Sequence, residues 1–279
     1  MSFEVASVKQ NKCGLPPECV TASNVDLLPG DSSYIPTGGL FTETNWYLMP
    51  LIVFSYKLSA NHYQLLTPQL PKWANTERFD IEARAAHSNP TKDQMRLMMQ
   101  SLLADRFKLV VHFETRQLSV FALVLDKPGK LGPTLRPHSD DPPCADALPE
   151  NAPPTVFRAT VAGGYPAVCG QRVGDGKPGH IHIGERNVSM EQIGTMLGPL
   201  AQVGRPVLDQ TGLDGKFDCI IEWVPQPNGT ATSGSDVQTD PTGPTFQEAL
   251  KDQLGLKLEP RTGPVEVLVI DHIEELSPN

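Results

Sequence analysis

A short phrase occurs twice in the chain, as "RFDIEARAAH" at residues 78–87 and as "KFDCIIEWVP" at residues 216–225. Each copy reads basic–Phe–Asp–apolar and opens an apolar run. Each is preceded by a segment that reads as a short strand, a polar corner and a helix with apolar residues at helical spacing. The preceding segments also align, pairing Glu43 with Glu185 and Asn45 with Asn187. These agreements predict a degenerate tandem duplication.

A second helix follows each phrase. We expect each of these helices to lead into a β-hairpin, over residues 108–127 with a turn at 115–119 and over residues 256–272 with a turn at 262–263. Helix starts are marked by capping boxes, in which two side chains satisfy free backbone N–H groups. The pairs that fit this pattern are Thr91–Gln94, Ser189–Gln192 and Thr245–Glu248.

The order β-α-β-α-β-β, found twice, predicts the α+β class. We expect two degenerate repeats that form one structure, with helices packed on mainly antiparallel sheet. The predicted core strand residues are Val110, Phe121, Leu123, Val267 and Val269. The predicted organisation is an N-terminal strand with a Cys/Pro-rich loop (1–37), repeat one (38–128), a Pro/Gly-rich insertion (129–177) and repeat two (178–279).

Composition places the chain among globular proteins. It has 279 residues, of which 39% are hydrophobic and 20% charged, so a substantial core is expected. With 23 basic and 32 acidic residues the net charge is -9. This charge argues against nucleic acid or anionic membrane as the main partner. No apolar run approaches the length of a membrane span, so we expect no membrane insertion. We expect the partner to be a small-molecule substrate or ligand.

The five cysteines bear on the compartment. Four of them lie in loop-like sequence, which gains most from a covalent tie, and Cys219 lies in an apolar strand. We expect disulfides Cys13–Cys19 and Cys144–Cys169 with Cys219 free; the alternative is five reduced thiols in a cytosolic protein. The disulfides would indicate a periplasmic or extracellular location. The sequence as given starts without the apolar region of an export signal.

Four longer segments are similar to those of the Solibacter-type family of secreted bacterial proteins. They are "FEVASVK" (3–9), "LLADRFKL" (102–109), "GRPVLDQTGLDGKFD" (204–218) and "LGLKLEPRTGPVEVLVIDH" (254–272). In that family the domain also occurs appended to membrane metallopeptidases of the antibiotic-sensor type. The resemblance implies export, and it implies hydrolysis of acyl-homoserine lactones as a candidate activity. It supplies no catalytic residues.

One candidate site begins the second copy. His180 and His182 replace Gly38 and Leu40 of the first copy. On a strand, residues two apart point to the same face, and Glu185 lies just beyond. The three residues predict a metal site or a general base with an orienting carboxylate. The alternative is a pair of exposed imidazoles on a polar sheet face.

A second candidate site is the turn "LDQTGLDGKFD", in which Asp209 and Asp214 have no counterpart in the first copy. Hard oxygen ligands in a turn suit Ca²⁺, the one cofactor that we predict, although the spacing is not that of an EF-hand. Ordinary turn chemistry is the alternative. The nucleophile motif G-x-S-x-G is absent from the sequence, as are H-E-x-x-H and the phosphate-binding loops.

Two functions from different classes follow. The first is a secreted hydrolase of a small lipophilic ester or lactone, which the family resemblance favours. The second is a non-catalytic extracytoplasmic module that binds a ligand or partner, which the missing catalytic motifs favour.

Overall fold

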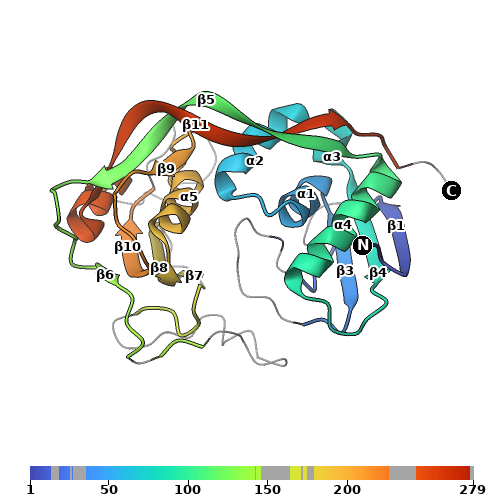
Figure 1. The fold of residues 1–279 in the computed structure, drawn as a ribbon, viewed down its shortest axis with the longest axis horizontal. Helices are drawn as coiled ribbons and strands as arrows, with labels where there is room; N and C mark the ends of the chain where they lie inside the picture. Colours follow the sequence, from blue (N-terminus) through green and yellow to red (C-terminus); the bar gives the residue numbers. More distant parts are fainter. Residues whose placement is uncertain are drawn as a thin grey trace. The chain divides into compact units, whose positions relative to one another are not determined.

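The computed structural model describes residues 1–13, 19–25, 27, 36–141, 143–145, 164–170, 172–174, 179–225 and 243–276. The chain groups into two compact units. Unit 1 comprises Met1–Leu118 and Gly263–Asn279, and unit 2 comprises Ser119–Thr262. Helices pack on mostly antiparallel sheets in this chain (Figure 1), so the predicted α+β class is confirmed. Residues 226–242, within predicted repeat two, lie outside the described residues.

The sheet of unit 1 has the strand order β1-β4-β3-β2, and all neighbours are antiparallel. Alternate residues of β4 are buried, as the apolar run after Phe79 requires. Helices α1 and α4 pack against each other, and both contribute buried side chains to the hydrophobic core of unit 1. The elements are β1 (Val5–Asn11), β2 (Ala22–Ser23), β3 (Leu40–Trp46), α1 (Leu48–Ser55), α2 (Ala60–Leu66), η1 (Thr67–Gln69), α3 (Lys72–Thr76), β4 (Arg78–Arg84) and α4 (Lys92–Phe107).

The sheet of unit 2 has the corresponding order β6-β10-β8-β7, again antiparallel throughout. The segment 129–177, expected as an insertion, contributes β6 and β7 in the positions that β1 and β2 hold in unit 1. The duplication itself stays a prediction. The elements are β6 (Leu135–Pro137), β7 (Arg172–Gly174), β8 (Ile181–Val188), α5 (Met190–Leu200), β9 (Val207–Asp209), β10 (Phe217–Trp223), α6 (Phe246–Ala249) and the π-helix η3 (Leu250–Leu254).

The three predicted capping boxes are present. In each, the N-cap hydroxyl accepts the backbone N–H of the third helical residue, whose side chain accepts the N-cap N–H in return. They begin α4 at Thr91, α5 at Ser189 and α6 at Thr245.

The two predicted hairpins are wrong. Residues 110–125 form one uninterrupted strand, β5 (Val110–Leu125), and residues 256–272 form another, β11 (Leu256–His272). The two strands are neighbours in a three-stranded sheet, β11-β5-β9, and run side by side in Figure 1. The polar residues expected as turns are therefore exposed mid-strand residues. Each long strand finds its partner in the distant long strand rather than by folding back on itself.

Each long strand begins in one unit and ends in the other. Leu268, from the last strand of the second copy, is buried in the core of unit 1. Leu123, from the last strand of the first copy, is buried in the core of unit 2. Leu123 and Val267 are thus core residues as predicted, Phe121 and Val269 are half-buried, and Val110 is 52% exposed, contrary to prediction. The last strand of each predicted repeat therefore ends in the unit that holds the rest of the other predicted repeat.

Candidate functional site in unit 2

The candidate site is built around an aspartate beside a β-bulge. The bulge places Arg186 and Asn187 of β8 opposite Asp218 of β10. Asn187 adopts the left-handed conformation, with φ 58°, which asparagine tolerates better than most side chains. Its backbone N–H donates to Oδ1 of Asp218 at 3.1 Å. The bulge therefore needs a hydrogen-bond acceptor at this position, and the buried Asp218 supplies it.

His138 gives Asp218 its second contact. It follows β6, and its backbone N–H donates to the carbonyl of Lys216, so the chain continues alongside β10. Its Nδ1 lies 2.6 Å from Oδ1 of Asp218, which is fully buried, whereas the His138 side chain is 10% exposed. Nε2 is 3.3 Å from the carboxylate of Asp140, an exposed residue. A buried carboxylate thus orients an imidazole whose other nitrogen lies beside the exposed Asp140.

Two arginines balance the charge of Asp218. Arg136 of β6 donates through Nε and Nη2 to Oδ2 at 3.4 and 3.3 Å. The buried Arg186 has its Nε 4.0 Å from the same oxygen. The guanidinium of Arg136 also lies 4.0 Å from the ring centre of Tyr165, and burial raises the pKa of the Tyr165 hydroxyl. The cluster combines an oriented imidazole with a partly exposed cation.

Unit 1 repeats the framework without the imidazole. Its bulge sets Asn45, with φ 60°, beside Asp80, and the N–H of Asn45 donates to Oδ1 of Asp80 at 2.9 Å. The second donor is the side-chain amide of Asn11, at the end of β1, with its nitrogen 2.7 Å from Oδ1. Burial, and secondarily the nearby Asp80, raise the pKa of Glu43 well above its ordinary value. The aspartate is common to both units, and the histidine belongs to unit 2 alone.

A disulfide lies beside the imidazole. The predicted pairs Cys13–Cys19 and Cys144–Cys169 are both present, and Cys219 is buried and belongs to neither disulfide, so the cysteine prediction is confirmed. Sγ of Cys144 is 3.8 Å from Nε2 of His138. The two disulfides fit a non-cytoplasmic protein. Within the described residues, no helix is long and apolar enough to cross a membrane.

The structure splits the predicted group of His180, His182 and Glu185. Nδ1 of His180 is 3.3 Å from a carboxylate oxygen of Glu222, and His182 lies opposite Glu222 in the β8–β10 register. Glu185 is three residues from His182 on a regular part of β8, so its buried side chain points to the opposite face. The histidines therefore share a face with Glu222 rather than with Glu185.

Asp209, one of the two predicted calcium ligands, makes contacts within its own turn. Oδ1 of Asp209 accepts the backbone N–H of Thr211 at 2.9 Å and its hydroxyl at 2.8 Å, an ordinary Asx turn. Asp214 is exposed. In the part of the chain that the structure describes, no three His, Cys, Asp or Glu side chains are grouped to hold a metal ion.

Sequence reasoning missed His138 because it treated residues 129–177 as an insertion. A signal was present. In both halves of the chain a strand ends in a polar residue, Asn11 or His138, shortly before the first cysteine of a disulfide pair. Aligning the two cysteine pairs would have placed these two residues together.

The family model described as "Protein of unknown function (DUF3738)" matches residues 49–273, which is more than half of the chain. The chain belongs to this family. The range matched to DUF3738 contains His138 and Asp218, whereas Asn11 lies before it. No curated protein and no solved structure matches the chain.

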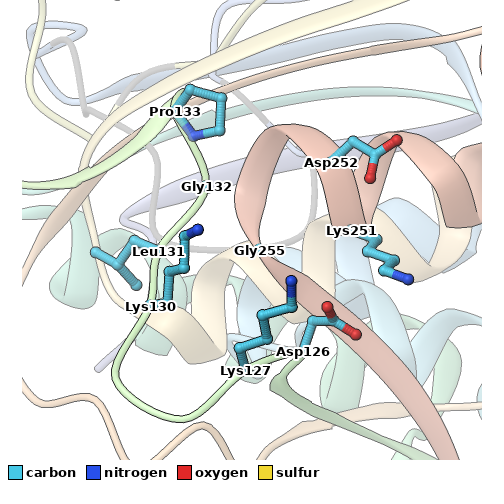
Figure 2. Close-up of a pocket in the computed structure, with 9 residues that line it drawn as sticks. All are labelled: Asp126, Lys127, Lys130, Leu131, Gly132, Pro133, Lys251, Asp252 and Gly255. Carbon is cyan, nitrogen blue, oxygen red and sulfur yellow. The ribbon is translucent and has the colours of Figure 1, made fainter.

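A pocket in unit 2 is a second candidate site. It has a volume of about 230 Å³ and lies between the loop after β5 and the end of η3. Figure 2 shows that Lys127 and Lys130 rise from that loop, while Lys251 and Asp252 come from the helical turn. The backbones approach closely here, since a Cβ on Gly132 would lie 2.2 Å from the carbonyl oxygen of Gln253. Its lining residues are Asp126, Lys127, Lys130, Leu131, Gly132, Pro133, Lys251, Asp252 and Gly255.

Proposed function

We propose that the chain is an extracytoplasmic hydrolase of a small ester or lactone, in which His138 activates the attacking water. The observation that carries the proposal is the 2.6 Å contact between Nδ1 of His138 and the fully buried Asp218. A carboxylate that holds Nδ1–H leaves Nε2 as the proton acceptor of the neutral imidazole. This is the arrangement that general-base catalysis requires.

The reaction proceeds in two steps. Nε2 of His138 takes a proton from water as the water oxygen attacks the carbonyl carbon of the substrate. We assign stabilisation of the resulting oxyanion to Arg136, a cation whose side chain is 44% exposed and which also contacts Asp218. The imidazolium then returns its proton to the leaving alkoxide oxygen, and the ring of a lactone opens.

Asp140 controls access to Nε2. Its carboxylate lies 3.3 Å from that nitrogen, and its side chain is 93% exposed. An exposed side chain changes rotamer at little cost, so water replaces this contact when substrate binds. The substrate class is supported by the resemblance to the Solibacter-type family, which points to acyl-homoserine lactones. The disulfides support a periplasmic or extracellular location.

Ring opening by the purified full chain tests the proposal. We expect turnover of a lactone panel that includes acyl-homoserine lactones, and the same turnover in the presence of a chelator, because proton transfer through His138 uses only side chains. A double variant, His180→Ala with His182→Ala, should keep this turnover. Loss of turnover in the double variant or on chelation would indicate that the reaction takes place instead at the face of β8 that carries these histidines.

A second function is favoured by the lysine pocket. Three lysines and two aspartates line it, which gives the lining one net positive charge on a chain whose net charge is -9. This local reversal of sign suits a small ligand with a carboxylate or phosphate group. The alternative function is therefore a module that binds a small anion.

Calorimetric titration with inorganic phosphate and with acetate tests this alternative. The variant Lys127→Ala combined with Lys251→Ala should abolish binding, while Lys9→Ala on β1 is the control. Binding that survives the double variant would reject the pocket as the anion site.

A further inference from the structure

The two disulfides of the chain differ in their surroundings. Cys13–Cys19 follows β1 and Cys144–Cys169 follows β6, so they occupy corresponding connections of the two sheets. Sγ of Cys144 is 3.8 Å from Nε2 of His138. In unit 1 the corresponding contact to the aspartate comes from the neutral amide of Asn11. Among the residues that the structure describes, the imidazole of His138 lies at a sulfur of the second disulfide.

The carboxylate of Asp218, the imidazole of His138 and the sulfur of Cys144 follow one another in a chain of contacts. The buried carboxylate of Asp218 holds Nδ1 of His138, and Nε2 of the same ring faces the sulfur of Cys144. A thiol beside an imidazole with an oriented carboxylate behind it is the arrangement in which sulfur reacts as thiolate. Cys144 and Cys169 are both partly exposed, so an external thiol can reach the bond. The other charged groups around the ring are Asp140, Arg136 and Arg186.

We propose that Cys144–Cys169 is a redox-active disulfide that exchanges with small dithiols, with Cys144 as the leaving sulfur. This activity uses the same imidazole as the proposed hydrolysis but does not depend on hydrolysis taking place. The ordering of the two sulfurs follows from His138, whose Nε2 lies 3.8 Å from Sγ of Cys144 and would stabilise negative charge there.

The exchange is balanced by the dithiol. The first thiol of the dithiol gives its proton to Nε2 of His138, and the resulting thiolate attacks Sγ of Cys169. The disulfide bond breaks, and its electron pair passes to Cys144 as a thiolate that faces the imidazolium. The second thiol of the reagent attacks the mixed disulfide, which releases Cys169 as a thiol and leaves the reagent as a cyclic disulfide. Two electrons and two protons pass from the dithiol to the protein. Because a stabilised thiolate leaves faster, His138 should accelerate the first step.

The test is the rate at which dithiothreitol reduces each disulfide of the folded full chain at neutral pH. Alkylation at intervals, followed by peptide mass measurement, reports the two bonds separately. We expect Cys144–Cys169 to be reduced about tenfold faster than Cys13–Cys19, and His138→Asn to remove about that factor while the rate for Cys13–Cys19 stays unchanged. Asn is the matched replacement because Asn11 makes the corresponding contact in unit 1.

Two checks keep the test decisive. The melting temperature of His138→Asn must match that of the wild type, and His138→Gln serves as the second amide variant if it does not. In denaturant the two disulfides should be reduced at similar rates, since the imidazole is then no longer positioned. Equal rates for the two disulfides in the folded chain, or an unchanged rate for Cys144–Cys169 in both variants, would overturn the proposal.

Discussion

Asn11 and His138 occupy corresponding positions in two sheets of the same strand order, each at the end of an edge strand and each in contact with a buried or half-buried aspartate. The distances are 2.7 Å from Asn11 to Asp80 and 2.6 Å from His138 to Asp218. The shared aspartate is explained by the bulge that it satisfies, so it needs no catalytic role. Unit 2 has the imidazole of His138 where unit 1 has the amide of Asn11, so at this position only unit 2 has a group that can accept and return a proton.

Glu43 makes the stability of unit 1 depend on pH. Its buried carboxyl group has a pKa raised well above 4.5, first by burial and then by Asp80. A group whose pKa is higher in the folded state binds its proton more tightly there, so the free energy of unfolding falls as pH rises from about 4.5 through the folded pKa. Glu43→Gln should remove this fall and raise the melting temperature at pH 8. Thermal scans from pH 4 to pH 8 measure both; a wild type with a flat profile would contradict this account of Glu43.

Because each long strand ends in a different unit from the one in which it begins, the unit that a core mutation in it destabilises can be predicted. Leu268→Ala removes a side chain that belongs by sequence to the second copy but is buried in unit 1, at a cost of about 2–5 kcal/mol. Hydrogen exchange should accelerate in α1, α4 and β4 rather than in β8 and β10. Leu123→Ala is the matched variant for unit 2 and should give the opposite pattern. Acceleration confined to β8 and β10 in Leu268→Ala would show that Leu268 does not pack in unit 1.

An exposed pair joins the two long strands in unit 1. Nδ1 of His112 on β5 lies 2.8 Å from a carboxylate oxygen of Asp271 on β11, and this hydrogen bond raises the pKa of His112 above 6.5. The stabilisation is therefore complete below the unfolded pKa and is lost as pH rises through the folded pKa. NMR titration should find the His112 pKa raised in the wild type and lowered by Asp271→Asn. An unshifted His112 in the wild type would show that the pair does not form in solution.

Asp209 allows the turn and calcium interpretations to be separated. Its Oδ1 caps the turn at Thr211, so Asp209→Asn keeps an acceptor and the melting temperature, whereas Asp209→Ala should cost about 1 kcal/mol. Denaturant unfolding with and without Ca²⁺ measures both effects. A calcium-dependent stabilisation of the wild type that Asp209→Asn abolishes would instead place a cation at this turn.

Local features of this chain were predictable because they are determined within a few residues. The capping pairs at Thr91, Ser189 and Thr245 were read correctly, since the N-cap and the third helical residue recognise each other without the rest of the fold. The disulfides were also predicted, from loop context. The α+β class followed from the order of the apolar patterns.

Reasoning from the sequence failed where a strand pairs with a segment far away in the chain. Residues 115–119 look like a turn, yet the strand continues through them because its hydrogen-bonding partner is β11, more than a hundred residues away. The role of His138 was missed for the same reason, because its contact with Asp218 forms only through the pairing of β6 with β10. His182 and Glu185 were grouped by proximity in sequence, although the alternation of the strand separates them.

The most direct test of the proposed site is the rate of lactone ring opening by His138→Asn, measured beside the wild type and Asn11→Ala. The asparagine keeps a donor to Asp218 but cannot accept and return a proton, so the account predicts a fall in kcat of about 100-fold or more with an unchanged melting temperature. Asn11→Ala alters the corresponding position of unit 1 and should leave kcat unchanged. If His138→Asn retains the wild-type kcat, His138 is not the base and the proposed site is wrong.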